Sequence, residues 1–272
     1  ICKEMQYDDY RIKIINQENK GVAAARNRGI EMATGKYITF VDADDIIEPE
    51  MYEVMQKDMY LNTADVTRVG AFIHDRKGNI RHIYNDNSVS VIDDKKEIIH
   101  KFATGELSIA VWDKMFTRNI VGDTRFKEKA YQEDTMFVWD IFKKTNKIVH
   151  DKKQLYHYIK RSSDSLTSKV FDDSSFTLQS YGKEFHDYII NNYPENELDA
   201  DIFYFNCMYF ILKRYIRDFD YIKDNIEYRN KIKSIIKEIE EMLPRINKDN
   251  IISEKNMNNI NEIKAKVLLY RG

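Results

Sequence analysis

Three carboxylates occur within four positions at Asp42-Ala43-Asp44-Asp45, directly after the apolar run Tyr37-Ile38-Thr39-Phe40-Val41. A short apolar run closed by turn residues predicts a buried strand, and open α/β sheets bind ligands at the carboxyl ends of such strands. Carboxylates this close repel one another, so a positive partner is expected. A divalent cation with oxygen ligands and a phosphate on its other face meets that need. A solvated acidic loop that caps the next helix is the alternative interpretation.

A second acidic pair, Glu133-Asp134, follows Gln132 where a helical apolar pattern begins. A carboxylate in a cleft can serve as a general base. Acidic residues also favour helix N-termini because of the helix dipole, so ordinary capping is the alternative for this pair.

The bulk properties of the chain exclude several classes of protein. Its 272 residues include 43 basic and 45 acidic residues, for a net charge of −2, so no nucleic-acid partner is indicated. No apolar run reaches the length of a membrane span, and the first residues do not resemble a signal peptide. Cys2 and Cys207 match no metal-binding spacing and fit a reducing cytoplasm.

Strand and helix patterns alternate through the first part of the chain and predict an α/β layer with a largely parallel sheet. The predicted helices are 1–10, 21–33, 49–60, 93–102 and one that opens at 132. The predicted strands are 11–15, 37–41, 64–72, 80–84, 108–112, 147–150 and 155–158.

Beyond about residue 168 the pattern is helical throughout. We therefore predict a catalytic domain at 1–168 and a helical C-terminal region at 169–272. One apolar stripe stands out, and it predicts either internal packing or a surface that docks on a membrane or a partner enzyme. The stripe consists of Ile232, Ile235, Ile236, Ile239 and Leu243.

Three of these features occur together in a recognisable order: Ala25-Arg26-Asn27-Arg28-Gly29, the Asp42–Asp45 turn, and Glu133-Asp134. In this order and spacing, residues 11–167 resemble the family 2 glycosyltransferases. The resemblance implies an A-type, Rossmann-like fold that binds a nucleotide sugar. It also implies transfer of a sugar from a nucleoside-diphosphate donor.

The resemblance assigns roles on the donor side of the site. Asp44 would ligate Mn²⁺ or Mg²⁺, and Asp42 would lie near the ribose or the metal, while Asp45 caps the following turn. Arg26 would contact the nucleotide, because a guanidinium suits phosphate and base edges. Arg161 would reach the diphosphate from a loop. The nucleotide is expected to be UDP, as is most frequent in the family.

On the acceptor side, Asp134 matches the family's catalytic base and Glu133 the residue before it. A base opposite the leaving group implies one displacement and inversion at the anomeric carbon. Trp112-Asp113-Lys114 resembles a Trp-x-Lys segment close to the acceptor, although Trp112 could equally be a core residue. Trp139 is expected in the core, and His157 is either structural or a metal ligand.

The implied acceptor is a hydroxyl of a glycan or of a lipid-linked molecule, in bacterial surface polysaccharide synthesis. The enzyme would then work in the cytoplasm, with the inner face of the membrane as an alternative location.

The family ordinarily begins with a strand-helix-strand unit that this sequence lacks, so the sheet is expected to be N-terminally incomplete and donor affinity low. A catalytically impaired fragment that binds a partner is therefore one alternative function. A phosphatase-like hydrolase with an Asp-x-Asp nucleophile is another, although Asp44 is followed by Asp45 rather than Thr or Ser.

Overall fold

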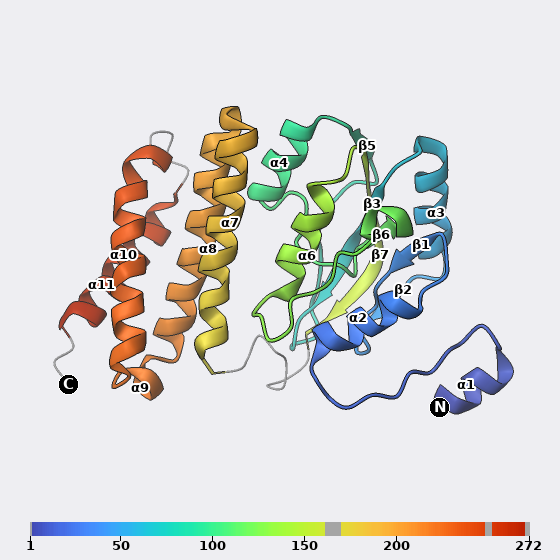
Figure 1. Ribbon diagram of the computed structural model, residues 1–272, viewed down its shortest axis with the longest axis horizontal. Helices are drawn as coiled ribbons and strands as arrows, with labels where there is room; N and C mark the ends of the chain where they lie inside the picture. The colour runs from blue at the N-terminus through green and yellow to red at the C-terminus, as the bar shows by residue number, and fades with distance from the viewer. Residues whose placement is uncertain (1, 161–169, 248–251, 270–272) are drawn as a thin grey trace.

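The chain folds into a mixed sheet with helices on both faces and a helical region beyond one of them (Figure 1). The computed structural model describes residues 2–160, 170–247 and 252–269. The predicted α/β fold with a C-terminal helical region is confirmed, whereas the division at residue 168 stays a prediction. The first helix, α1 (Cys2–Asp8), lies apart from the body and has no buried residue (Figure 1).

The strands of the sheet are β1 (Tyr37–Thr39), β2 (Ile46–Ile47), β3 (Val66–His74), β4 (Ile80–His82), β5 (Val89–Ile92), β6 (Lys114–Thr117) and β7 (Ile148–Ile159). The helices of the first part are α2 (Val22–Met32), α3 (Met51–Asn62), α4 (Lys95–Ala103), α5 (Arg118–Val121) and α6 (Glu133–Phe142). The helices of the second part are η2 (Asp173–Phe176), α7 (Thr177–Asn192), η3 (Pro194–Asn196), α8 (Glu197–Arg217), α9 (Phe219–Ile222), α10 (Ile226–Ile246) and α11 (Glu254–Leu269).

The prediction of a largely parallel sheet is wrong. The strand order is β1-β6-β3-β7-β2, and β3–β7 is the one parallel pairing among the described strands. Two features reverse the strand direction. The turn at 75–79 makes β3 and β4 a hairpin, and a long loop follows α4 before β6 begins. A helix between two strands makes them parallel only when it crosses back over the same sheet.

Four of the predicted strands differ from the structure. Residues 11–15 form no strand, because alternation alone does not stabilise a segment that lacks a paired neighbour. The strand predicted at 108–112 is a loop, and the strand begins only at Lys114. The two strands predicted at 147–150 and 155–158 are one continuous strand, β7.

The sheet separates two apolar clusters, as period-2 alternation requires. On one face, Met51, Met55 and Met59 of α3 pack against Val69 and Ala71 of β3. On the other face, Val66 of β3 belongs to a larger cluster that continues through α4 and α6 into α7, α8, α10 and α11. Helix α6 therefore lies between the sheet and the helical region (Figure 1).

The apolar stripe of α10 serves internal packing. Ile232, Ile235, Ile236 and Ile239 are all buried, at most 4% exposed, within the larger cluster. This stripe is therefore unavailable for a membrane or a partner enzyme. Within the described part of the chain, no helix has the length and apolar character needed to cross a bilayer.

Gly70 lies at the register shift between β3 and β7 and offers a test of the sheet. A Cβ atom there would lie 2.6 Å from the Lys152 carbonyl oxygen and 2.8 Å from Gln154 Nε2. We expect Gly70→Ala to lower the free energy of unfolding by about 1–3 kcal/mol, because backbone cannot move aside as a flexible side chain can.

Chemical denaturation measures this loss. Gly29→Ala in α2 is the control, since nothing lies within 4 Å of its Cβ position, and it should leave stability unchanged or slightly raised. Equal stability of the Gly70 and Gly29 variants would contradict the β3–β7 register.

Candidate active site

A cleft of about 620 Å³ opens at the end of β1, where α2 and α6 both begin. Its wall combines polar and aromatic side chains from segments far apart in the sequence. The lining includes Lys20, Gly21, Arg26, Asp42, Ile109, Ala110, Trp112, Tyr131, Glu133, Asp134 and Tyr158. The acidic turn and the Glu-Asp helix start therefore face the same cleft.

The guanidinium of Arg26 joins the acidic groups of this cleft. Its Nη1 donates to Glu133 Oε1 at 2.9 Å and to Asp134 Oδ1 at 2.5 Å, and its Nη2 donates to Asp42 Oδ1 at 2.7 Å. The Arg26 side chain is 12% exposed, so these ion pairs are largely shielded from solvent. The positive group that neutralises Asp42 is thus an arginine of the chain itself.

Local backbone geometry brings the two acidic segments to Arg26. Gln132, the residue before α6, has a left-handed conformation with φ 52° and ψ 53°. This is uncommon for a residue other than glycine, and it turns the chain sharply into the helix. Glu133 and Asp134 then occupy the first turn, where the helix dipole favours negative charge.

Burial raises the pKa of Asp134 from 3.8 to about 7, because desolvation disfavours the carboxylate. Arg26 opposes this rise, whereas the negative charges of Glu133 and Asp42 add to it. The charge of the three carboxylates raises the pKa of Arg26 although its burial acts in the opposite direction. A carboxyl with a pKa near neutrality suits a general base.

Asp45 has a different position from the predicted turn cap. Its Oδ2 accepts a hydrogen bond from the Tyr156 hydroxyl at 2.7 Å, and its Oδ1 accepts one from the Ile159 backbone N–H at 2.8 Å. The same hydroxyl accepts the Asp42 N–H at 3.1 Å. Asp45 and Tyr156 therefore fasten the acidic turn to β7 and fix the backbone beside Asp42.

The acidic turn can supply part of a metal site. Asp42 lines the cleft and Asp44 is exposed beside it on the same turn. Nowhere in the described ranges do three His, Cys, Asp or Glu side chains form a metal-binding cluster. Two carboxylates nevertheless fit Mg²⁺ or Mn²⁺, because such ions at phosphate sites take one or two carboxylates and complete their ligands with phosphate oxygens and water.

Trp112 lies on the wall of the cleft and Lys114 does not. The indole of Trp112 stacks on Tyr156 with ring centroids 4.4 Å apart and on Tyr158 at 5.6 Å. Trp112 and Tyr158, called here the aromatic wall, both line the cleft. The Lys114 side chain is 0% exposed and lies behind the loop that carries Trp112.

Other predicted residues lie away from the cleft. Trp139 is buried in the larger apolar cluster, as predicted. His157 pairs through Nε2 with Glu48 at 2.8 Å and through Nδ1 with His74 at 2.9 Å, which favours its structural role. Arg161 lies outside the described residues, so its contact with a diphosphate stays a prediction.

The sequence prediction missed the cations Lys20 and Lys129, which line the cleft. It placed Tyr156 and Tyr158 in a strand that resembles an aromatic strand of the family, without a role for either; Tyr158 lines the cleft, and Tyr156 supports the acidic turn. The alternation of Tyr156 and Tyr158 placed both on one face of a strand, but no local signal indicated that this face meets the acidic turn.

The buried carboxyl of Asp134 predicts a stability difference that depends on pH. In the unfolded chain this group loses its proton near pH 3.8, whereas in the folded chain it does so near pH 7. The folded state therefore binds the extra proton between these values, and stability falls as pH rises through this window. Asp134→Asn cannot ionise at this position. We therefore expect the stability of this variant, relative to the parent, to increase as the pH rises from about 4 to about 7 and to stay constant above about pH 7.

Melting temperatures from about pH 2 to about pH 8 measure the effect. Asp201→Asn is a control of opposite sign, because contacts with Arg245 and His186 outweigh burial and hold the pKa of Asp201 at about 2. That variant should be less stable than the parent above about pH 4, with the deficit shrinking toward pH 2. A constant difference for Asp134→Asn from pH 4 to 7 would contradict the raised pKa.

Comparison with known proteins gives one consistent result. Residues 1–121 match the model of the family described as Glycosyl transferase family 2. The chain is 32% identical over 166 residues to glycosyltransferase GlyA of Streptococcus pneumoniae. The aligned region makes up 58% of this chain and 24% of that protein. It is 28% identical over 216 residues to the putative glycosyltransferase EpsH of Bacillus subtilis. Here the aligned region makes up 70% of this chain and 61% of that protein. The chain thus spans less than two thirds of these relatives.

Solved structures share the fold. The crystal structure of S. aureus TarS residues 1–349 in complex with UDP-GlcNAc superposes with a TM-score of 0.65 and 17% identity, covering 98% of this chain and 76% of that one. A likeness at this identity concerns the fold. The structure therefore has the A-type fold, and the match of residues 1–121 to the family model supports a family 2 glycosyltransferase.

Proposed function

We propose that this chain is a metal-dependent, inverting glycosyltransferase. It would move a sugar from a UDP-sugar to a hydroxyl of a glycan or lipid-linked acceptor, in bacterial surface polysaccharide synthesis on the cytoplasmic side. The observation that carries the proposal is the meeting of Asp42 and Asp134 on one arginine in one cleft. Relatives named as glycosyltransferases and the UDP-GlcNAc complex of TarS support the substrate class.

On the donor side, Asp42 and Asp44 would hold Mn²⁺ or Mg²⁺. The bound ion would supply electrostatic stabilisation of the departing diphosphate. The chain contributes further positive charge, because Arg26, Lys20 and Lys129 line the cleft. Arg26 already bridges Asp42 and Asp134, so it can keep the donor and acceptor sides of the site in a fixed relation.

On the acceptor side, the Asp134 carboxylate would accept the proton of the acceptor hydroxyl. The new bond forms between that oxygen and the anomeric carbon, and the bond to the diphosphate oxygen breaks with its electron pair leaving on the diphosphate. One displacement from the opposite face inverts the anomeric carbon. Glu133 and Asp42 favour this proton transfer, because their charges help to raise the pKa of Asp134.

Binding of the nucleotide tests the donor side. We expect UDP to bind in the presence of Mn²⁺, and Asp44→Asn to weaken this binding by about tenfold or more because a neutral amide is a poorer ligand for a hard cation. Isothermal calorimetry with and without Mn²⁺ measures both effects. Asp220→Asn is the control, since its side chain is 90% exposed on α9. No binding of UDP by the parent would favour the impaired fragment that binds a partner.

Turnover tests the base. We expect Asp134→Asn to lower the rate of sugar transfer by about 10²-fold or more while the affinity for UDP changes little, because the amide cannot take up the proton. Release of UDP from UDP-GlcNAc, UDP-glucose and UDP-galactose is a suitable assay. Asp140→Asn is the control, on the same helix but paired with Lys143. Unchanged turnover in the Asp134 variant would show that another group is the base.

A further inference from the structure

The loop at 104–113 connects α4 to β6 and forms part of the cleft wall through Ile109, Ala110 and Trp112. It has no regular secondary structure, so its carbonyl groups take their hydrogen-bond donors from other parts of the chain. The carbonyls of Val111 and Asp113 accept backbone N–H groups, whereas those of Glu106, Ser108 and Ala110 accept charged side chains.

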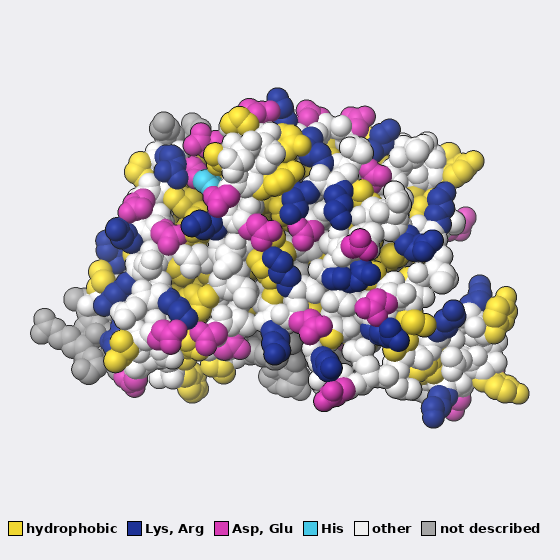
Figure 2. Space-filling view, in the orientation of Figure 1, with side chains coloured by type: hydrophobic (Ala, Val, Ile, Leu, Met, Phe, Trp, Pro, Cys, Tyr) yellow, Lys and Arg dark blue, Asp and Glu magenta, His cyan; other side chains and the backbone are white. Residues whose placement is uncertain are grey.

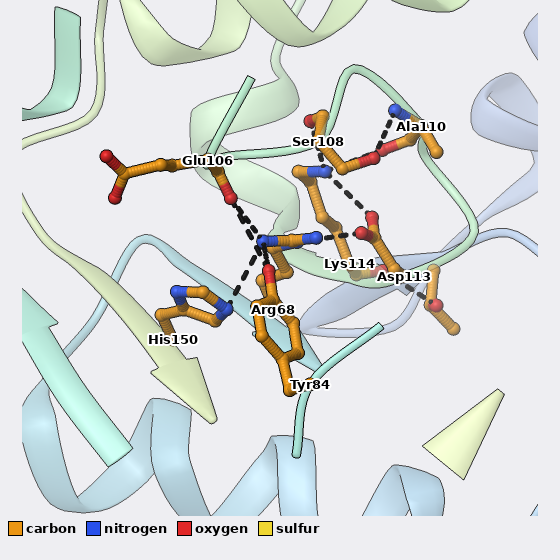
Figure 3. Close-up of polar contacts among 9 residues, drawn as sticks. Arg68, Tyr84, Glu106, Ser108, Ala110, Asp113, Lys114 and His150 are labelled. Atoms are coloured by element: carbon orange, nitrogen blue, oxygen red, sulfur yellow. Dashed lines mark hydrogen bonds and ion pairs between the residues drawn. The ribbon is translucent and has the colours of Figure 1, made fainter. Parts of the chain in front are cut away.

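Lys114 supplies the first set of donors. Its ammonium donates to the carbonyl oxygens of Ser108 at 2.6 Å and Ala110 at 2.7 Å, and to Asp113 Oδ1 at 2.7 Å (Figure 3). These three bonds match the three donors of an ammonium group. Lys114 therefore braces the loop from behind while Ala110 lines the cleft.

Arg68 of β3 supplies the second set. Its Nε donates to Asp113 Oδ2 at 2.8 Å, and its Nη1 donates to the Glu106 carbonyl oxygen at 2.6 Å (Figure 3). His150 Nε2 lies 3.2 Å from the same Nη1. Burial and the charge of Arg68 lower the pKa of His150 to about 4, so the neutral ring can accept this bond. Two cations thus hold the carbonyls of Glu106, Ser108 and Ala110.

We propose that Lys114, Asp113 and Arg68, called here the bracing cluster, are positioning residues that hold the loop at 104–113 so that Trp112 keeps its place in the aromatic wall. This inference rests on the proposed function and adds that the aromatic wall borders the acceptor sugar, the side on which the sequence resemblance places Trp112. An aromatic surface suits a sugar ring because its apolar face packs on the C–H groups of the ring.

The cost of the cluster supports a positioning role. Asp113 and Lys114 are at most 1% exposed and Arg68 is 2% exposed. Burying such charges costs several kcal/mol per ion before their attraction is counted, and apolar residues of similar volume often serve stability as well. What apolar residues cannot do is hold three particular carbonyls of an irregular loop. Groups beside an active site must be held to within about 0.5 Å, and this cluster provides such support.

The fluorescence of Trp112 reports on this placement. The chain has two tryptophans, so a Trp139→Phe background leaves Trp112 as the single emitter. Trp139 is a suitable residue to replace, because its indole nitrogen is buried without a hydrogen-bond partner among the described residues. In this background we expect Lys114→Met to raise the acrylamide quenching constant of Trp112 by about twofold or more, because the loop opens to solvent.

Lys95→Met is the matched control. Lys95 also donates to three backbone carbonyls, those of Phe142, Lys143 and Thr145, but it does so at the end of α6 that lies away from the cleft. The Lys95→Met variant should be less stable than the parent, with the quenching constant of Trp112 unchanged. If Lys114→Met does not fold, Arg68→Lys is the second variant. It keeps the positive charge but loses the guanidinium group that reaches Glu106, so it should also raise the quenching constant of Trp112. Unchanged quenching in the folded variant, or an equal rise in the Lys95 variant, would overturn the proposal.

Calorimetry with UDP and Mn²⁺ separates this proposal from the proposed function. We expect the affinity of Lys114→Met for UDP to stay within about threefold of the parent, because the loop lies on the acceptor side. If the affinity for UDP fell by the same factor as the acrylamide quenching constant rose, the acceptor-side assignment would be overturned. Absence of UDP binding in the parent would instead count against the donor site, and the quenching result would still decide the role of the cluster.

Discussion

The site depends on one guanidinium that three carboxylates share. Asp42 follows β1, Glu133 and Asp134 begin α6, and Arg26 lies on α2 between them. Removing one partner from a buried ion pair typically costs about 3–5 kcal/mol, because it leaves a charge without compensation. The three segments are therefore held at one point although they are distant in the sequence. Burial raises the pKa of Asp134, and the excess of negative charge that this arrangement leaves around it raises the pKa further.

Irregular segments of the cleft are held by buried polar contacts rather than by strand pairing. The acidic turn is fastened to β7 by Asp45 and the Tyr156 hydroxyl, and the loop at 104–113 is held by Lys114 and Arg68. Functional residues commonly lie on loops that a rigid scaffold supports. Here the supporting groups are on β3, β6 and β7, so the central strands of the sheet position both sides of the cleft.

The helical region contributes through α6. Its first turn carries Glu133 and Asp134, while Trp139 further along packs against Phe102 and Phe185. One helix therefore connects the acidic centre of the cleft to the core shared with α7 and α8. Charged side chains of both signs are interspersed over the face seen in Figure 2, in keeping with a net charge of −2.

The sequence by itself determined the elements whose signals are local. Helix α2, the β1 strand with its acidic turn, the start of α6 and the helix predicted at 93–102 all follow from periodicity and capping within a few residues; in the structure, the Asp94 side chain caps α4 by accepting the Lys96 N–H. Only the tertiary structure decided the strand directions, the loop at 108–112, the burial of Lys114 and the partner of Arg26. Each of these depends on which distant segments meet, because a charge or a backbone carbonyl takes whichever partner the folded chain brings within hydrogen-bond distance.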